Sequence, residues 1–207
     1  MSDKLNNSIL SNLGFKATSD QELVASHLDS FTYSNTNNPV YILKGYAGTG
    51  KTSMISAFVE SLANISTNFV LLAPTGRAAK VLSKYTGHVA HTVHRYIYFY
   101  TTSKDGITNI ILGPNKLSNT IFIIDESSMI SDTSQNNNSL FGNNSLLDDI
   151  ITFVFSNKGN KLLLVGDTAQ LPPVGINLSP ALDIENIKRA YSVTSYDFEM
   201  KKVMRQA

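Results

Sequence analysis

Residues 45–52 of the chain read Gly45-Tyr46-Ala47-Gly48-Thr49-Gly50-Lys51-Thr52. This stretch fits the pattern G-x-x-x-x-G-K-[ST] of a phosphate-binding loop. The apolar run at 40–43 before it predicts a buried strand, and the apolar spacing at 53–63 after it predicts a helix. A chance glycine-rich turn is the alternative, but it does not explain the flanking strand and helix. The stretch therefore predicts a site for a nucleoside triphosphate.

The chemistry of the loop assigns its residues. Glycines let the backbone wrap a phosphate, and amides at the start of a helix point toward the anion. Lys51 can reach the β- and γ-phosphates, and the Thr52 hydroxyl can ligate Mg²⁺. We expect ATP and Mg²⁺ as ligands, bound by Gly45, Ala47, Gly48, Thr49, Gly50, Lys51 and Thr52.

Composition restricts the class of protein. The chain has 207 residues, of which 42% are hydrophobic, so it can bury a sizeable core. Its formal net charge of +1 means that a nucleic-acid site would have to be a local patch. It contains no cysteine, its N-terminus has no apolar signal core, and no apolar run is long enough to span a membrane. We expect a cytoplasmic protein with no membrane partner.

The order of apolar segments predicts an α/β fold. Buried strands are expected at 40–43, 69–73, 121–124 and 162–165, alternating with amphipathic helices. This alternation is typical of a mainly parallel sheet with helices on both faces. The segment 96–119 interrupts it and predicts an inserted β-hairpin. Residues 1–15 are polar, and we expect them to be loosely held.

A further helix is expected from Thr18, with Leu23, Val24, Leu28 and Phe31 on one side. At its start, Gln21 has two interpretations. It fits a capping box with Thr18, and it also fits a glutamine that binds the adenine edge of a nucleotide. Both interpretations stay open.

Polar residues follow two of the expected strands. Asp125 and Glu126 end the strand at 121–124, where Asp125 can hold the Mg²⁺ shell and Glu126 can polarise the attacking water. Two solvated acids at a strand end are the alternative. Gln170 lies in a segment after the strand at 162–165, where it could bind the γ-phosphate or simply belong to a turn. With Lys51, these side chains are the candidate catalytic groups.

Two polar segments beside the sheet are candidates for nucleic-acid contacts. Threonine, histidine and backbone amides at such positions can bind the phosphates of a nucleic-acid strand. The expected contacts are Pro74, Thr75, Arg77, Thr92 and His94. The tyrosines at 96, 98 and 100 could stack on bases, but at least two of them are expected to pack the hairpin against the domain.

Together these motifs resemble superfamily-one helicases of the RecD and phage Dda type. Gln21 corresponds to the Q motif of that family, 45–52 to motif I, 73–79 to motif Ia and 92–94 to motif Ib. Residues 125–129 match the form D-E-x-S-M of motif II, and 166–173 match the form G-D-x-x-Q-L-P-P of motif III. Residues 204–206 resemble the start of motif IV, in which Arg205 would contact the γ-phosphate.

The resemblance implies a RecA-like ATP-binding motor domain over 1–207, which couples ATP hydrolysis to movement on single-stranded DNA, with 5′-to-3′ polarity, and to duplex unwinding. The hairpin at 96–119 would separate strands. A second RecA-like domain would follow motif IV and is absent from this chain, so we expect a piece of a longer protein. Nuclease or replication subunits remain open as partners. An ATPase switch or loader on DNA that does not unwind is the alternative function.

Overall fold

The computed structural model describes residues 3–102, 108–130, 145–169 and 179–203. The helices are α1 (Asp3–Asn12), α2 (Ser19–Tyr33), α3 (Lys51–Asn64), α4 (Gly76–Thr86), α5 (Val93–Ile97), α6 (Leu146–Phe155) and α7 (Ile184–Ala190). The strands are β1 (Pro39–Gly45), β2 (Phe69–Ala73), β3 (Ala90–Thr92), β4 (Tyr98–Thr102), β5 (Thr108–Leu112), β6 (Ile121–Ile124), β7 (Lys161–Gly166) and β8 (Thr194–Met200). Two short 3-10 turns lie at Ser127–Met129 and Pro180–Leu182.

Six strands form one sheet in the order β3-β2-β6-β7-β1-β8. All of the neighbouring pairs are parallel. This confirms the α/β fold with a parallel sheet. Because parallel strands end at the same edge, the segments after β1, β2, β6 and β7 all emerge on one side of the molecule.

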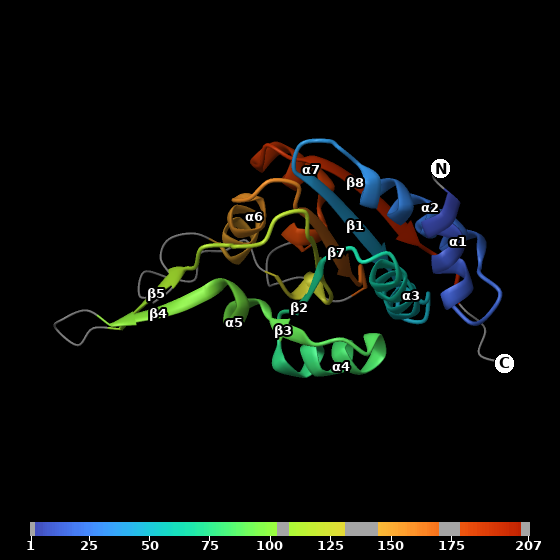
Figure 1. The fold of residues 1–207 in the computed structure, drawn as a ribbon, viewed down its shortest axis with the longest axis horizontal. Helices are drawn as coiled ribbons and strands as arrows, with labels where there is room; N and C mark the ends of the chain where they lie inside the picture. The colour runs from blue at the N-terminus through green and yellow to red at the C-terminus, as the bar shows by residue number, and fades with distance from the viewer. Residues whose placement is uncertain (1–2, 103–107, 131–144, 170–178, 204–207) are drawn as a thin grey trace.

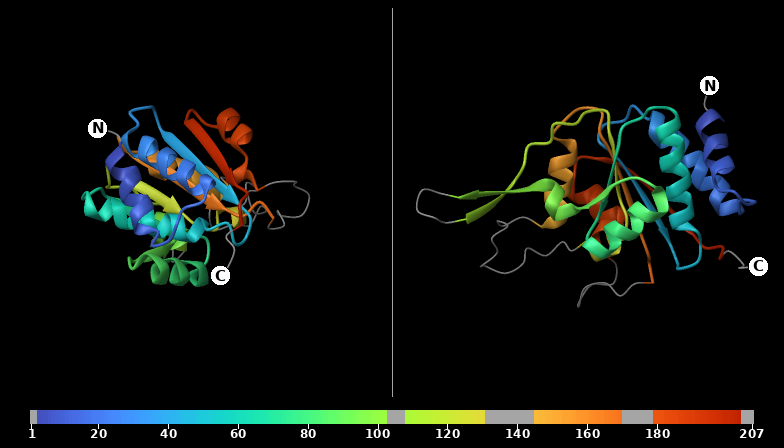
Figure 2. Two further views of the ribbon diagram at one scale, coloured as in Figure 1. Left: turned by 90° about the vertical axis from the view of Figure 1, so that its right-hand side faces the viewer. Right: turned by 60° about the horizontal axis from the view of Figure 1, so that its bottom comes forward.

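Two apolar layers cover the sheet (Figures 1 and 2). Side chains of α1 to α4 pack on one face, against alternate residues such as Tyr41 and Leu43 of β1. Side chains of α5, α6 and α7 pack on the other face, against Val40 and Ile42. The continuous apolar runs of the sequence follow from this arrangement, because every central strand is buried on both faces.

The expectation that residues 1–15 are loosely held is wrong. Residues 3–12 form α1, which packs against α2 and α3. It has few apolar side chains, but two of them are fully buried: Leu5 is 1% and Ile9 is 0% exposed. Asn12 also donates a side-chain hydrogen bond to the Ser61 hydroxyl of α3 at 2.9 Å. Two buried residues one helical turn apart therefore fix a segment that looks polar on average.

The β-hairpin expected within 96–119 is present, and it consists of β4 and β5. β4 pairs with β5 in antiparallel register and extends away from the main sheet (Figure 1). Tyr96 belongs to α5 instead of the hairpin, and it packs edge-on against Phe122 and Phe153. Tyr98 is buried and donates a 2.6 Å hydrogen bond to the Asp149 carboxylate of α6. Two of the three tyrosines thus hold the hairpin to the domain, while Tyr100 is 75% exposed.

Two other details differ from the sequence prediction. Leu23 of α2 is 49% exposed and does not share the buried side of Val24 and Leu28. The edge strand β8 was not predicted at all, because it alternates polar residues such as Asp197 and Glu199 with aromatic ones. Within the described ranges, no helix has the combination of length and hydropathy that a membrane crossing requires.

We expect Ile9→Ala in α1 to lower the free energy of unfolding by about 2–4 kcal/mol, because it removes a fully buried side chain from the core. Leu23→Ala, at an exposed position, is the control and should change it by less than about 0.5 kcal/mol. Urea denaturation followed by circular dichroism measures both. Equal effects of the two substitutions would mean that α1 does not belong to the core.

Candidate nucleotide-binding site

The phosphate loop joins the end of β1 to the start of α3, as the sequence predicts. Gly48 and Gly50 have φ angles of 80° and 90°, a backbone region that favours glycine. At Gly45, a Cβ atom would lie 2.9 Å from the Met200 carbonyl oxygen and 2.9 Å from the Thr49 hydroxyl. Glycine is needed there because β8 and the loop approach the end of β1 too closely for a side chain.

The Lys51 side chain is folded back over the loop. Its ammonium group donates to the carbonyl oxygens of Gly45 at 2.5 Å and Tyr46 at 3.0 Å. It also lies 3.7 Å from the carboxylate of Asp167, which follows β7. The loop carbonyls and one acid thus hold the ammonium group over the loop.

Asp125 and Glu126 lie at the end of β6 but have different backbone conformations. Glu126 has a φ of 55°, in the left-handed region, which is unusual for a residue other than glycine. Its amide donates to the Asp125 carboxylate at 2.9 Å, and the Ser127 hydroxyl donates to the Ile124 carbonyl at 2.8 Å. These bonds offset a backbone strain of about 1–3 kcal/mol.

Burial raises the pKa of the Asp125 carboxyl to about 6. The hydrogen bond from the Glu126 amide lowers the pKa, the Glu126 charge raises it further, and the Lys51 charge lowers it. Desolvation is therefore the dominant effect. A divalent cation in contact with this carboxylate would favour the ionised form, so the site fits a metal-binding role.

One pocket of about 570 Å³ brings the predicted nucleotide residues together. Its lining includes seven of them, namely Ala47, Gly48, Gly50, Lys51, Thr52, Asp125 and Glu126. The pocket lies at the carboxyl ends of β1, β6 and β7, where ligands bind in open parallel sheets. The phosphate loop and the acids Asp125, Glu126 and Asp167 thus line one pocket, as expected of a nucleotide site.

Two loop residues that were expected to bind nucleotide do not line the pocket. Gly45 is the close-packed strand end, and Thr49 is fully buried, with its hydroxyl donating to the Tyr46 carbonyl at 2.8 Å. Both residues help to fix the conformation of the loop. Their direct contact with nucleotide stays a prediction.

Gln21 is fully buried and does not line the pocket. Its side-chain oxygen accepts from the Thr18 amide at 2.9 Å, and its own amide donates to the Thr18 hydroxyl at 3.3 Å. The structure therefore contains the capping box of the sequence analysis, while contact with adenine stays a prediction. Gln170 and Arg205 lie outside the described residues.

Sequence reasoning missed several residues of the pocket. Asp167 belongs to the third motif, but its ion pair with Lys51 has no local signal, because the two residues are 116 positions apart. The lining also includes Tyr46, Ser53, Tyr85 and Gly166. Tyr85 comes from the last turn of α4, and its carbonyl accepts from the Ser56 hydroxyl of α3 at 2.8 Å. Only the packing of α4 on α3 brings it to the site.

The expected nucleic-acid contacts lie at the far edge of the sheet. Ala73 and Thr92 are partners in the parallel register of β2 and β3. The two polar segments at the ends of these strands therefore start side by side. The hydroxyl oxygens of Thr75 and Thr92 accept from amides of their own helices at 3.2 and 3.4 Å. Arg77 and His94 are exposed on the first turns of α4 and α5. Pro74 leads into the first of these turns.

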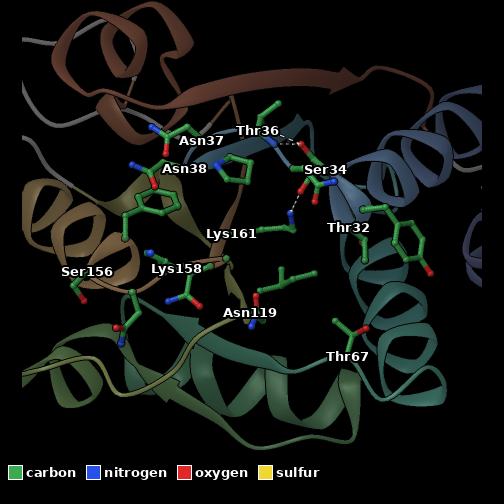
Figure 3. A pocket seen from close by; sticks show the side chains of 18 residues that line it. Thr32, Ser34, Thr36, Asn37, Asn38, Thr67, Asn119, Ser156, Lys158 and Lys161 are labelled. Carbon is green, nitrogen blue, oxygen red and sulfur yellow. Dashed lines mark hydrogen bonds between the residues drawn. The ribbon is translucent and has the colours of Figure 1, made fainter.

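A larger cavity, of about 720 Å³, lies at the amino ends of the strands, whereas the first pocket lies at their carboxyl ends (Figure 3). It is open at the amino ends of β1, β6 and β7, and its lining is rich in asparagine. The Lys161 ammonium group points to the Ser34 carbonyl and donates a hydrogen bond to it. No residue assigned to nucleotide or nucleic acid lies there. Size alone therefore does not identify the site.

The described residues contain no cluster of three or more His, Cys, Asp or Glu side chains that could hold a metal ion. Mg²⁺ in nucleotide sites needs no such cluster, because phosphates and waters supply most of its ligands. Thr52 and Asp125 both line the pocket and are the protein groups suited to this task.

The chain is similar to several known proteins. The model of the AAA domain family matches residues 31–176. The ATP-dependent RecD2 DNA helicase of Deinococcus radiodurans is 34% identical over 137 residues, which are 66% of this chain and 16% of that protein. The ATP-dependent DNA helicase dda of phage T4 is 43% identical over 53 residues, 25% of this chain and 12% of that protein.

The fold has a solved counterpart in the Pif1 helicase from Candida albicans. The two structures have a TM-score of 0.56 and 22% sequence identity, over 93% of this chain and 41% of that chain. This likeness confirms the fold class. The chain spans less than a fifth of the length of the RecD2 helicase it matches.

The chain belongs to the AAA domain family, because the family model covers well over half of its residues. Within that family, the likeness to RecD2 and dda confirms the resemblance to the motor domain of superfamily-one helicases.

We expect Asp125→Asn to stabilise the nucleotide-free chain by about 1–3 kcal/mol at pH 7.5. The folded chain keeps the Asp125 proton up to about pH 6, whereas the unfolded chain releases it near pH 4, so the cost of the buried charge develops as the pH rises between these values. The gain should therefore shrink at pH 4.5. Urea denaturation at both pH values measures it, with the exposed substitution Glu60→Gln as the control. A gain of the same size at both pH values would contradict a raised pKa.

Proposed function

We propose that this chain is the ATP-binding motor domain of a DNA helicase, in which ATP hydrolysis drives movement along single-stranded DNA, 5′ to 3′, and separation of the duplex. The observation that carries the proposal is the convergence of Lys51, Thr52, Asp125 and Glu126 on one pocket at the carboxyl edge of the sheet. The names of the RecD2 and dda relatives, both ATP-dependent DNA helicases, support it.

In this proposal the nucleotide phosphates bind over the start of α3. The first amides of a helix have no partner within the helix, and the helix dipole favours an anion there. Lys51 moves from the loop carbonyls to the β- and γ-phosphates and exchanges two neutral acceptors for charged ones. Asp167, which pairs with Lys51 in the described structure, then lies next to the reacting phosphate.

The two acids divide the remaining chemistry. Asp125 and Thr52 would hold Mg²⁺, which would neutralise charge on the phosphates. Glu126, which lines the same pocket, would orient and polarise the attacking water. Gln170 and Arg205 are proposed to contact the γ-phosphate.

Single-stranded DNA is proposed to bind across the ends of β2 and β3. The Thr75 and Thr92 hydroxyls accept bonds from helix amides, which leaves each hydroxyl hydrogen to donate to a phosphate. Desolvation lowers the pKa of His94, so its ring is neutral at physiological pH and can act as a hydrogen-bond donor. Arg77 adds charge. The hairpin β4–β5 is the proposed strand-separating element, anchored at Tyr98.

We expect Lys51→Ala to weaken binding of Mg²⁺ and a non-hydrolysable ATP analogue by about 1.5–3 kcal/mol, because it removes a charged hydrogen bond to phosphate. Glu126→Gln should bind the analogue like the original chain but lower ATP turnover, since the amide keeps the shape and loses the base. Lys116→Ala, at an exposed lysine outside the pocket, is the control. Isothermal titration calorimetry and a phosphate-release assay measure the two effects. Unchanged affinity in the Lys51 variant would overturn the nucleotide assignment.

We expect Arg77→Ala to weaken binding of single-stranded DNA and to reduce the slope of log affinity against log salt by about one. Arg189→Ala is a matched control, because Arg189 lies on α7 beside β8, at the other edge of the sheet. Fluorescence anisotropy at several salt concentrations measures both. An equal loss in the two variants would place DNA elsewhere, and ATP turnover insensitive to single-stranded DNA in the parent protein would favour a switch or loader.

A further inference from the structure

The segment that leaves β8 is held by the start of α2. One carboxylate oxygen of Asp20 accepts from the amides of Lys201 at 2.8 Å and Lys202 at 2.9 Å. The Lys202 ammonium group also donates to the Ser19 hydroxyl at 2.5 Å. Two consecutive amides on one ionised oxygen form a strong contact, because hydrogen bonds to charged groups are roughly twice as strong as neutral ones. This contact joins residues about 180 positions apart in sequence.

The other side of this segment faces the phosphate loop. A Cβ atom on Gly48 would lie 3.4 Å from a methyl carbon of Val203, and one on Gly45 would lie 2.9 Å from the Met200 carbonyl oxygen. The segment 200–203 therefore passes between the start of α2 and the loop. Val203 is 62% exposed, so burial alone does not hold it in place.

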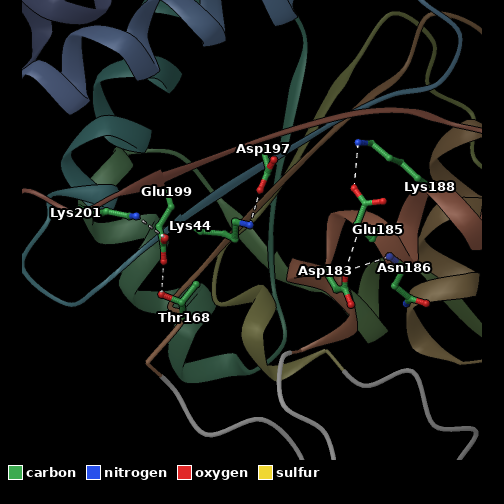
Figure 4. Close-up of polar contacts among 9 residues, drawn as sticks. All are labelled: Lys44, Thr168, Asp183, Glu185, Asn186, Lys188, Asp197, Glu199 and Lys201. Carbon is green, nitrogen blue, oxygen red and sulfur yellow. Dashed lines mark hydrogen bonds and ion pairs between the residues drawn. The ribbon is translucent and has the colours of Figure 1, made fainter.

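A second contact joins the same segment to the residues after β7. The Thr168 hydroxyl donates to the Glu199 carboxylate at 3.1 Å, and the Lys201 ammonium group lies 3.7 Å from Glu199 (Figure 4). Thr168 follows Asp167, the partner of Lys51. The end of β8 is thus linked to two sides of the nucleotide pocket.

The Asp20 carboxyl is suited to this contact at neutral pH. Its partial burial raises the pKa, but the amide bonds from Lys202 and Lys201, the Lys202 charge and the Ser19 hydroxyl outweigh it, so the pKa lies below the ordinary value. The group is ionised, and the two amides have a charged acceptor.

We propose that Asp20 is a positioning residue, whose carboxylate holds the segment 200–203 against the phosphate loop and thereby strengthens nucleotide binding. The inference rests on the proposed nucleotide site. With the segment held, Val203 restricts the loop at Gly48 before the ligand arrives, and less conformational freedom is lost on binding.

The contact itself is tested on the nucleotide-free chain by amide hydrogen exchange in NMR. In Asp20→Ala, the amides of Lys201 and Lys202 should exchange about tenfold faster than in the original chain. Glu22→Ala removes an acid from the same first turn of α2, and its side chain is exposed, so it is the matched control with unchanged exchange. Unchanged exchange in Asp20→Ala would overturn the proposal, whether or not the chain binds nucleotide.

The consequence is tested by titrating the same variants with Mg²⁺ and a non-hydrolysable ATP analogue. Asp20→Ala should bind about three- to tenfold more weakly, and Asp20→Asn, which keeps one carbonyl acceptor, should recover affinity to within about twofold. Glu22→Ala should match the original chain. Faster exchange with unchanged affinity would overturn the positioning role alone. Failure of the original chain to bind the analogue would instead overturn the proposed nucleotide site.

Discussion

The close approach of β8 and the phosphate loop to the end of β1 at Gly45 is the constraint on which the proposed nucleotide site depends. In the register of the sheet, Gly45 is the partner of Met200 in β8, and the residue before it, Lys44, is the partner of Gly166 in β7. A side chain at Gly45 would collide with the Met200 carbonyl and with Thr49. Because the strands are packed so tightly, the loop after β1 must turn at once, and its amides and Lys51 come to face the acids that follow β6 and β7.

Charge balance follows from that arrangement. Lys51 lies between loop carbonyls and Asp167, and its charge also lowers the pKa of Asp125 against the effect of burial. The site thus keeps a cation and partly buried acids close together. This arrangement costs free energy, because the charged groups lose contact with water. Buried charges of this kind are common where a ligand later supplies the missing partners.

Much of this could be predicted from local patterns, and the rest depends on contacts that no local pattern contains. The phosphate loop, the four central strands and the acids at 125 and 126 are short, contiguous signals, and the structure has them where they were expected. Helix α1 was missed because its few apolar residues, chiefly Leu5 and Ile9, stand in a segment that is polar on average. Strand β8 was missed because an edge strand alternates polar residues that a central strand does not tolerate. The contacts of Asp20 with Lys201 and of Lys51 with Asp167 join distant parts of the chain, so only the fold brings them together.

The proposed nucleotide site lies at the carboxyl edge of the sheet, apart from the larger cavity at the amino edge. An NMR titration of the labelled chain with Mg²⁺ and a non-hydrolysable ATP analogue tests it most directly. We predict amide shift changes at 45–53, 125–126 and 166–167, with the resonances of Asn119 and Lys158 unchanged. Shift changes confined to the amino-edge cavity would contradict the account.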